Sequence, residues 1–275
     1  MTIRIAARAK VNLCLHVTGQ SGDGFHLLDS VVAFADVADI LTFESAENLT
    51  LTIDGPFADG LSSDNDNLIL QAARCFANPA GAAIHLQKNL PVASGIGGGS
   101  ADAAAALLGL SQLWNCALPD AATQLSLGAD VPVCVVGETV RMQGVGEDIT
   151  PITGLPALPA ILINPGVAVS TPSVFKALTK KKNTQLEARE VSLDWLTAQR
   201  NDLQGPATSL APMIAEVVTK LEETGALLAR MSGSGATCFG IFRTMKTAQA
   251  IAAMLSEQHP EWWVQATTLN RSNDA

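Results

Sequence analysis

The residues best suited to chemistry lie in a glycine-rich segment near the middle of the chain. Gly95, Gly97, Gly98 and Gly99 fall within five positions and are followed by Ser100 and a run rich in alanine. Glycines leave backbone N–H groups uncovered, and a helix starting at Ser100 adds its unsatisfied first-turn amides and its positive dipole end. The segment therefore predicts a cradle for a di- or triphosphate, and Ser100 can offer its hydroxyl to a phosphate or to Mg²⁺.

This segment differs from two well-known phosphate loops. No Gly-Lys-Ser/Thr ends it, so it is not a Walker A motif, and Ser100 stands where G-x-G-x-x-G requires its third glycine. The alternative is a flexible turn before a helix, but an ordinary turn needs one or two glycines rather than four. We therefore interpret the segment as a phosphate-binding loop.

Three further groups of residues could take part in chemistry. Lys10 and Asn12 are two residues apart, so on a strand both side chains point to the same side; a lysine on a strand is nevertheless usually just exposed. Asp130, within 128–132, follows a helix end and suits either a catalytic base or a plain turn or cap residue. The segment 232–236, Ser-Gly-Ser-Gly-Ala, is equally compatible with a tight hairpin and with a functional loop.

Length and charge restrict the class of protein. The 275 residues are 48% hydrophobic, enough for one large or two modest domains. Neither an apolar stretch of about 20 residues nor a signal peptide is visible in the sequence, which predicts a cytoplasmic protein. The net charge of −9 disfavours nucleic acid and anionic membranes as partners. The dense basic run Lys180–Lys182 is interpreted as a solvated loop.

The five cysteines predict neither a disulfide framework nor a zinc site, because their number is odd and none forms a CxxC pair. We expect them to be small buried hydrophobic residues in a reducing compartment. They are Cys14, Cys75, Cys116, Cys134 and Cys238.

The order of the expected elements predicts an α+β fold. In the first half we expect strands at 11–17, 31–34, 40–43, 49–53 and 84–86, helices at 66–77, 100–114 and 119–128, and a hairpin of 133–136 with 139–142. Asp66 is the expected cap of the first helix, and Gly128 is expected in the left-handed conformation.

In the second half we expect strands at 160–164, 226–231, 237–242 and 263–269, and helices at 172–179, 212–224 and 245–257. Thr171 is the expected cap before Pro172. The proline-rich stretch 150–159 predicts a boundary between domains at 1–152 and 153–275.

Taken together, the ordered motifs resemble the GHMP kinases, the superfamily of galactokinase, homoserine kinase and mevalonate kinase. Besides the glycine-rich loop, the resemblance covers nearly the whole chain and rests on Ala9–Gly19, Asp23–Leu28, Leu127–Pro132, Gly144–Glu147 and Met231–Thr237. Any one of these motifs alone would be a weak signal, whereas the ordered set is specific.

The resemblance implies a fold and a reaction. The fold would be a ribosomal-protein-S5-like N-terminal domain followed by a ferredoxin-like C-terminal domain. The reaction would be transfer of the γ-phosphate of ATP, brought with Mg²⁺, to the 2-hydroxyl of a cytidine diphosphate derivative of methylerythritol, in non-mevalonate isoprenoid synthesis. The resemblance adds no protein site for a metal and no obligate protein partner.

The resemblance also implies roles for individual residues. Asp130 falls on the position of the catalytic aspartate, and Lys10 on that of its partner lysine. The implied substrate-binding residues are Asn12, Phe25, His26, Thr171 and Phe175. The implied ATP-binding residues are Pro91, Val92, Ala93, Ser94, Gly95, Ile96, Gly97, Gly98, Gly99, Ser100 and Ala101.

Two positions depart from the family pattern. Phe25 stands where the family often has tyrosine, so the ring can stack on a base but has no hydroxyl to donate. Arg8 replaces a common proline.

Two alternatives remain at this point. Another GHMP kinase is one, although the galactokinase sugar motif is absent and 23–26 favours the cytidine compound. A nucleotide-binding regulator without turnover is the other, and the presence of both Lys10 and Asp130 argues against it.

Overall fold

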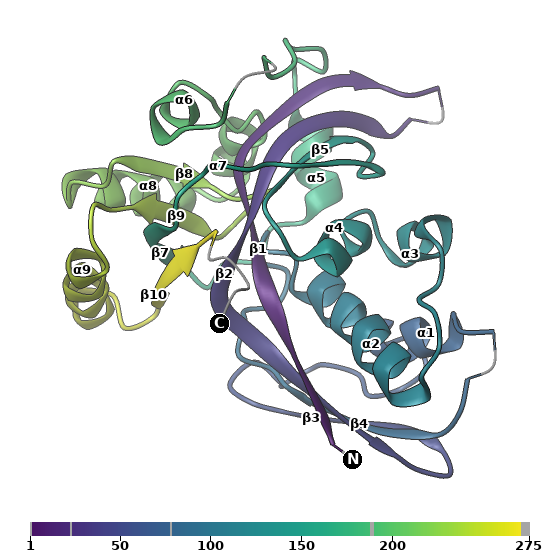
Figure 1. Cartoon of the computed structure of the whole chain (residues 1–275). Coiled ribbons are helices and arrows are strands. Elements are labelled where there is room, and N and C mark those ends of the chain that lie inside the picture. Colours follow the sequence, from purple (N-terminus) through teal and green to yellow (C-terminus); the bar gives the residue numbers. More distant parts are fainter. Residues whose placement is uncertain (1, 23, 78, 188–189, 271–275) are drawn as a thin grey trace. The chain divides into compact units, whose positions relative to one another are not determined.

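The computed structural model describes residues 2–22, 24–77, 79–187 and 190–270 and divides into two compact units (Figure 1). The first unit contains the chain up to Ala9, Val37–Val92 and Gly97–Gly137, and the second contains Lys10–Asp36, Ala93–Ile96 and the chain from Glu138 onward. Two long strands, β1 (Ile3–Gln20) and β2 (His26–Ser45), supply residues to both units.

The first unit combines a small sheet with a group of helices. Within it, β4 pairs antiparallel with the second part of β2 and parallel with β3. Helices α1 and α4 pack on α2, whose buried face is made largely of alanines. At Gly109 of α2 a side chain would collide with the ring of Phe43, so glycine is needed for this close approach to β2. The elements are β3 (Leu49–Asp54), α1 (Leu68–Arg74), β4 (Ala82–Gln87), α2 (Gly98–Trp114), α3 (Ala121–Leu127) and α4 (Val131–Val136).

The second unit contains a sheet in which neighbouring strands follow the order β2, β10, β7, β9, β8. All of these pairs are antiparallel, and β5 extends the pairing from the first part of β2 to β6. Helices α8 and α9 pack on its strands. The elements are β5 (Val140–Gly144), β6 (Asp148–Pro151), β7 (Leu158–Asn164), α5 (Thr171–Ala177), α6 (Leu193–Thr197), α7 (Gln204–Leu210), α8 (Met213–Glu223), β8 (Leu228–Met231), β9 (Cys238–Ile241), α9 (Met245–Gln258) and β10 (Trp263–Leu269).

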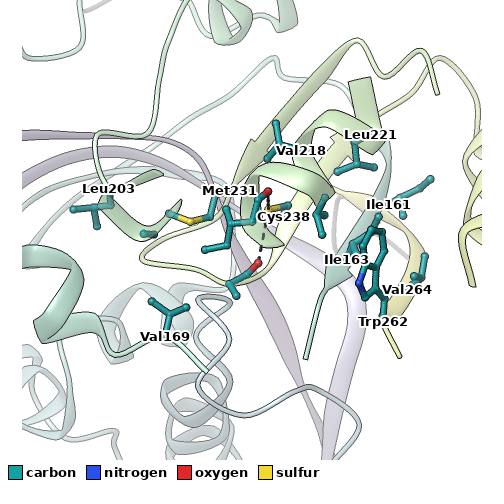
Figure 2. Packing of buried hydrophobic residues seen from close by; sticks show 14 of the residues in the cluster. Ile161, Ile163, Val169, Leu203, Val218, Leu221, Met231, Cys238, Trp262 and Val264 are labelled. Atoms are coloured by element: carbon teal, nitrogen blue, oxygen red, sulfur yellow. Dashed lines mark hydrogen bonds between the residues drawn. The ribbon is translucent and has the colours of Figure 1, made fainter. Parts of the chain in front are cut away.

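The hydrophobic core of the second unit lies between this sheet and its helices (Figure 2). Ile161 and Ile163, two residues apart on β7, point into it together. From α8, Val218 and Leu221 contribute side chains three residues apart on one helical face. Each such buried side chain contributes about 1.5–3 kcal/mol to folding. This core therefore stabilises the sheet whose strands carry part of the site.

The α+β prediction and most element predictions for the second half are confirmed. The expected strands at 160–164, 226–231, 237–242 and 263–269 correspond to β7, β8, β9 and β10, and the expected helices at 172–179, 212–224 and 245–257 to α5, α8 and α9. Helices α6 and α7 and strand β6 were not anticipated.

Two predictions for the first half are wrong in type or extent. The strands expected at 31–34 and 40–43 are parts of the single strand β2. The hairpin expected at 133–136 is instead the helix α4, which has Pro132 in its first turn and ends at Gly137 with a φ of 65°. Its buried valines pack on α2, and this tertiary contact overrides the strand preference of valine.

Predictions about helix ends were also corrected. Asn67, not Asp66, caps α1, because its side chain accepts the N–H of Ile69. Gly128 has a φ of 160°, which is extended rather than left-handed. Ser170 precedes α5, so Thr171 is its first helical residue rather than its cap.

All five cysteines are free, but only three are buried. Cys75 is half-buried and Cys116 is exposed, so the expectation of burial is wrong for these two.

Candidate active site

The segment between β8 and β9 holds the first half of the glycine-rich loop. The N–H of Thr237 donates to the carbonyl of Ser94 at 2.9 Å, and the hydroxyl of Ser232 donates to the carbonyl of Gly95 at 3.0 Å. Both partners belong to the second unit. The segment 232–236 is therefore more than a turn between two strands, because it is also the support for 94–95.

Gly95 is required by this contact. A Cβ at Gly95 would lie 2.7 Å from the carbonyl oxygens of both Ser232 and Gly235, closer than side-chain carbons come to such atoms. Its φ of 77° lies in the left-handed region that glycine occupies without strain. This glycine serves packing between two loops, whereas the sequence had suggested access for phosphate.

The strand β1 brings its polar residues to the same two loops. The N–H of Lys10 donates to the carbonyl of Ile96 at 2.9 Å, and the N–H of Asn12 donates to the hydroxyl of Ser232 at 3.0 Å. Both side chains are buried, so Lys10 is not the exposed strand lysine that its position alone would suggest. Three motifs distant in the sequence thus converge within the second unit.

The side chain of Asn12 is only partly hydrogen-bonded by the residues described. Its amide nitrogen donates to the hydroxyl of Ser30 at 2.7 Å, and that hydroxyl donates to the carbonyl of Cys14 at 2.6 Å. Among the described residues, Oδ1 of Asn12 has no hydrogen-bond partner although it is buried. An unpaired buried acceptor is costly, and a ligand hydroxyl or amine could satisfy it.

A second part of the predicted substrate site is an aromatic stack. The ring of His26, at the start of β2, stacks on Phe175 of α5 with centroids 4.6 Å apart and planes 22° apart. Burial lowers the pKa of His26, and the charge of Lys181 lowers it further, so the ring is neutral at pH 7. Its Nε2 has no partner among the described residues. Phe25, 64% exposed, presents its ring to the surroundings.

Thr171 links α5, which carries Phe175 of this stack, to the segment 232–236 that supports the glycine-rich loop. Its hydroxyl lies 2.7 Å from that of Ser234, so the start of α5 is bonded to the segment that supports the glycine-rich loop. From the sequence, Thr171 was expected to bind substrate and to cap the helix. The structure gives its hydroxyl to Ser234 instead of to the helix.

In the first unit, the second half of the loop becomes the start of α2. Gly97 precedes the helix with a φ of 70° and, like any glycine, offers no side chain to cap it. The first turn of α2 carries no acidic residue. Its N–H groups and dipole therefore offer a site for an anion.

The glycines of this turn are not all demanded by packing. At Gly99 an added Cβ would meet only Leu68, at an ordinary distance of 3.6 Å, and at Gly98 it would lie 3.3 Å from Nζ of Lys88. The absence of a backbone obstacle at Gly99 favours a role in close approach to a ligand.

Asp130 lies near the same helix start. It precedes α4, but its side chain does not cap that helix. Two residues earlier, a Cβ at Gly128 would lie 3.5 Å from the hydroxyl of Ser100, so this segment borders the first turn of α2. Asp130 belongs to the first unit and Lys10 to the second, and their pairing stays a prediction.

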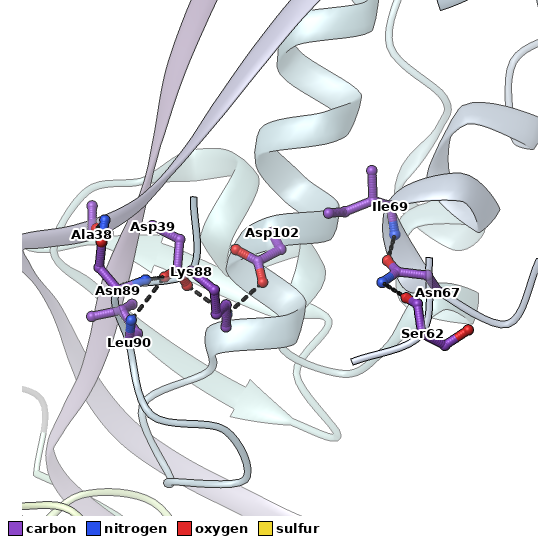
Figure 3. A network of polar contacts seen from close by, with 9 residues as sticks. All are labelled: Ala38, Asp39, Ser62, Asn67, Ile69, Lys88, Asn89, Leu90 and Asp102. Atoms are coloured by element: carbon purple, nitrogen blue, oxygen red, sulfur yellow. Dashed lines mark hydrogen bonds and ion pairs between the residues drawn. The ribbon is translucent and has the colours of Figure 1, made fainter. Parts of the chain in front are cut away.

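The first unit contains a buried ionic cluster that was not predicted from the sequence. Nζ of Lys88 lies 2.5 Å from Asp39 and 2.6 Å from Asp102 (Figure 3). Lys88 and Asp102 flank the glycine-rich loop in the sequence. A charged residue inside an apolar run is usually buried with a partner. Asp102 stands among alanines, so the sequence did contain a signal for this cluster.

Comparison with known proteins identifies the family. The model for the GHMP kinases N terminal domain matches residues 67–138, and that for the GHMP kinases C terminal matches 175–261. A relative from Ruegeria pomeroyi named 4-diphosphocytidyl-2-C-methyl-D-erythritol kinase is 53% identical over 272 residues, covering 96% of this chain and 98% of its own. One of the same name from Cereibacter sphaeroides is 54% identical, covering 94% and 96%. The chain belongs to the 4-diphosphocytidyl-2-C-methyl-D-erythritol kinase family of GHMP kinases.

Solved structures agree with membership of this kinase family. The crystal structure of a 4-(cytidine 5'-diphospho)-2C-methyl-D-erythritol kinase is 33% identical, with a TM-score of 0.84 over 98% of this chain and all of the other. A homoserine kinase from Cytophaga hutchinsonii, 19% identical with a TM-score of 0.71 over 98% of this chain and 95% of its own, shares the fold. The expected GHMP kinase fold is confirmed.

Three further observations complete the description of this GHMP kinase. Throughout the described ranges, every helix is too short or too polar to cross a bilayer. The same residues place no three His, Cys, Asp or Glu side chains around a possible metal position. A pocket of about 510 Å³ in the second unit is lined by residues outside the predicted site: Gln199, Arg200, Asn201, Gln204, Gly205, Thr208, Ala215, Val218, Thr219, Ala229 and Arg230.

Proposed function

We propose that this kinase transfers the γ-phosphate of ATP to the 2-hydroxyl of 4-diphosphocytidyl-2-C-methyl-D-erythritol, in the non-mevalonate route to isoprenoid precursors. The observation that carries the assignment is identity above 50%, over nearly the whole chain, to relatives of that name. The site features described above support it, because they supply an anion site, a neutral aromatic stack and unpaired polar atoms.

ATP is proposed to bind along Pro91–Ala101, with its phosphates over the first turn of α2. The N–H groups of that turn and the helix dipole would stabilise the charge that develops on the phosphate oxygens. Mg²⁺ prefers oxygen ligands and usually binds through one or two protein oxygens together with phosphates and water. The donors present fit this pattern, since the hydroxyl of Ser100 lies at the helix start, and Mg²⁺ would neutralise phosphate charge there.

The cytosine ring is proposed to stack near Phe25 and Phe175. Because the imidazole of His26 is neutral at pH 7, its unpaired Nε2 can accept a hydrogen bond from the amino group of the base. The unpaired Oδ1 of Asn12 can accept one from a substrate hydroxyl. Thr171 would complete this region through its bond to Ser234.

The chemical step is proposed to use Asp130 and Lys10. An alcohol becomes a good nucleophile when a positioned base accepts its proton. Asp130 suits this role because its segment borders the proposed phosphate site. Lys10 would hold Asp130 and the reacting hydroxyl in line.

The cellular setting and the domain division are part of the same proposal. We place the protein in the cytoplasm, acting on small molecules without an obligate protein or nucleic-acid partner, and we divide the chain into domains at 1–152 and 153–275.

A panel of acceptors tests the function. Purified protein is incubated with ATP and with diphosphocytidyl-methylerythritol, mevalonate, homoserine or galactose, and ADP release is followed. Turnover should be fastest with the cytidine compound. Faster phosphorylation of mevalonate or homoserine would point to another GHMP kinase, and ATP binding without turnover on any acceptor would point to a regulator.

A further inference from the structure

Three buried charged residues lie together next to the two ends of the glycine-rich loop (Figure 3). Lys88, Asp39 and Asp102 are exposed by only 1%, 0% and 5%. Lys88 lies three residues before the loop begins at Pro91, and Asp102 is on α2 directly after the loop ends at Ala101. All three belong to the first unit, and their position at both ends of the loop is the starting observation.

Asp39 fixes the chain that enters the loop. One of its carboxylate oxygens accepts the N–H groups of Asn89 and Leu90, at 2.5 and 2.8 Å, while the other accepts from Lys88. The side chain of Asn89 also donates to the carbonyl of Ala38. Residues 88–90 are therefore bonded to β2 through both backbone and side chains.

Lys88 connects this entry to the chain that leaves the loop. Its ammonium lies 2.6 Å from Asp102 of α2 and 3.3 Å from the position of a Cβ at Gly98. Gly98 is the first residue of α2, and Asp102 is four residues later, about 6 Å along the helix axis. One ammonium thus joins both ends of the loop.

We infer that Lys88, Asp39 and Asp102 act as a loop clamp, a set of positioning residues that holds the glycine-rich loop in the conformation that binds the triphosphate of ATP. The inference rests on the part of the proposed function that makes ATP the phosphate donor. Charged hydrogen bonds among buried groups are strong and directional, so they suit a loop whose glycines otherwise leave the backbone many conformations.

The loop clamp carries one more negative than positive charge when all three groups are ionised. Oδ1 of Asp102 has no hydrogen-bond partner among the described residues. Lys88 therefore balances the charge of two buried carboxylates.

Among the described residues, Asp102 faces Lys88, in the segment after β4, and Asp39, on β2. Of the helices that pack on α2, α4 carries no charged residue, and α1 carries only Arg74, which is bonded to Asn65.

Two variants of Asp102 test the loop clamp. Asp102→Asn keeps the shape and an acceptor for Lys88 and leaves one ammonium with one carboxylate, whereas Asp102→Ala removes the acceptor. Asp102→Ala should raise the dissociation constant and KM for ATP about tenfold or more, since a hydrogen bond to a charged group is lost. Asp102→Asn should change them much less, and kcat at saturating ATP should change little in either.

The separation of KM from kcat gives a readout that a merely structural role would not change. A variant that is only less stable contains less active enzyme and loses kcat, whereas a disturbed loop raises the KM for ATP and leaves kcat at saturating ATP. If Asp102→Ala does not fold, Asp102→Ser replaces it, because its side chain is too short to accept from Lys88 as the carboxylate does.

Asp29→Asn is a matched control. It disrupts another buried ion pair, Asp29 with Arg141 at 2.7 Å, in the second unit. It should lower the melting temperature but leave the dissociation constant and KM for ATP unchanged. Wild-type ATP affinity in folded Asp102→Ala, or in folded Asp102→Ser where Asp102→Ala does not fold, would overturn the loop clamp. Because the dissociation constant of ATP is measured without an acceptor, a wrong acceptor in the proposed function leaves that measurement valid.

Discussion

Replacing Gly99 with valine separates ATP binding from stability more cleanly than any other change in the loop. A Cβ there would meet only Leu68, at 3.6 Å, so the protein itself offers no obstacle. Glycine is a poor helix former, and we expect the free energy of unfolding of Gly99→Val to stay within about 0.5 kcal/mol of wild type. The added methyl groups would instead occupy space needed by the phosphates. ATP affinity should fall at least about a hundredfold, or about 2.8 kcal/mol.

Gly95→Ala is the contrasting variant. Its Cβ would lie 2.7 Å from the carbonyl oxygens of Ser232 and Gly235, and the left-handed backbone alone costs roughly 1–3 kcal/mol for a residue with a side chain. This variant should lose stability before any ligand is added. Gly98 is less suitable, because its Cβ would press on Lys88 at 3.3 Å.

Urea unfolding and calorimetric titration with ATP would measure both quantities for each variant. Folded Gly99→Val protein that binds ATP normally would refute the placement of phosphates over this turn. A Gly95→Ala protein as stable as wild type would refute the packing argument.

The remaining predictions concern the reaction, the base and the loop clamp. Asp130→Asn should lower kcat by about 10²–10⁴-fold with little change in ATP affinity; a variant that keeps most of its kcat at saturating substrates would exclude a base. Combining it with Lys10→Ala should cost less than the product of the single losses, because the two residues act as a unit, and a fully multiplicative loss would contradict the pair. Phe175→Ala should weaken binding of the cytidine substrate by roughly 1–3 kcal/mol while sparing ATP, as titration with each ligand would show. Lys88→Met should lower the free energy of unfolding by about 3–5 kcal/mol, since two buried carboxylates lose their ammonium. Asp102→Asn should cost much less in the same urea titration, and equal losses would show that charge balance does not matter in this cluster.

Local signals were sufficient to predict much of the second half of the fold. In α8 the buried residues Ile214, Val217, Val218 and Leu221 follow the spacing of one helical face, and Gly225, with a left-handed φ of 82°, follows the end of the helix. Here propensity, pattern and turn chemistry agree with the tertiary structure.

The errors arose where distant residues decide local structure. Strand β2 seemed to be interrupted because charged residues stand in its middle, yet Asp39 is buried there by pairing with Lys88. Helix α4 looked like a strand because it is rich in valine, and its packing on α2 decides otherwise. A single sequence shows neither contact.

The motifs of the candidate site could be predicted from the sequence, but the contacts between those motifs could not. The glycine-rich loop was recognised from composition alone. That Gly95 packs on Ser232 and Gly235, more than 130 positions away, while Gly99 does not need to be glycine for packing, follows only from contacts in the folded protein. The pairing of Lys10 with Asp130 stays a prediction for the same reason.

The distribution of β1 and β2 between the two units has a consequence at the level of the gene. The codons of the first unit are interrupted by those for Lys10–Asp36 and Ala93–Ile96. A fragment starting at Glu138 would lack the β2 residues with which β5 and β10 pair. Recombination between related kinases at one crossover point could not exchange a whole unit, so chimaeric enzymes need junctions inside both long strands and inside the glycine-rich loop.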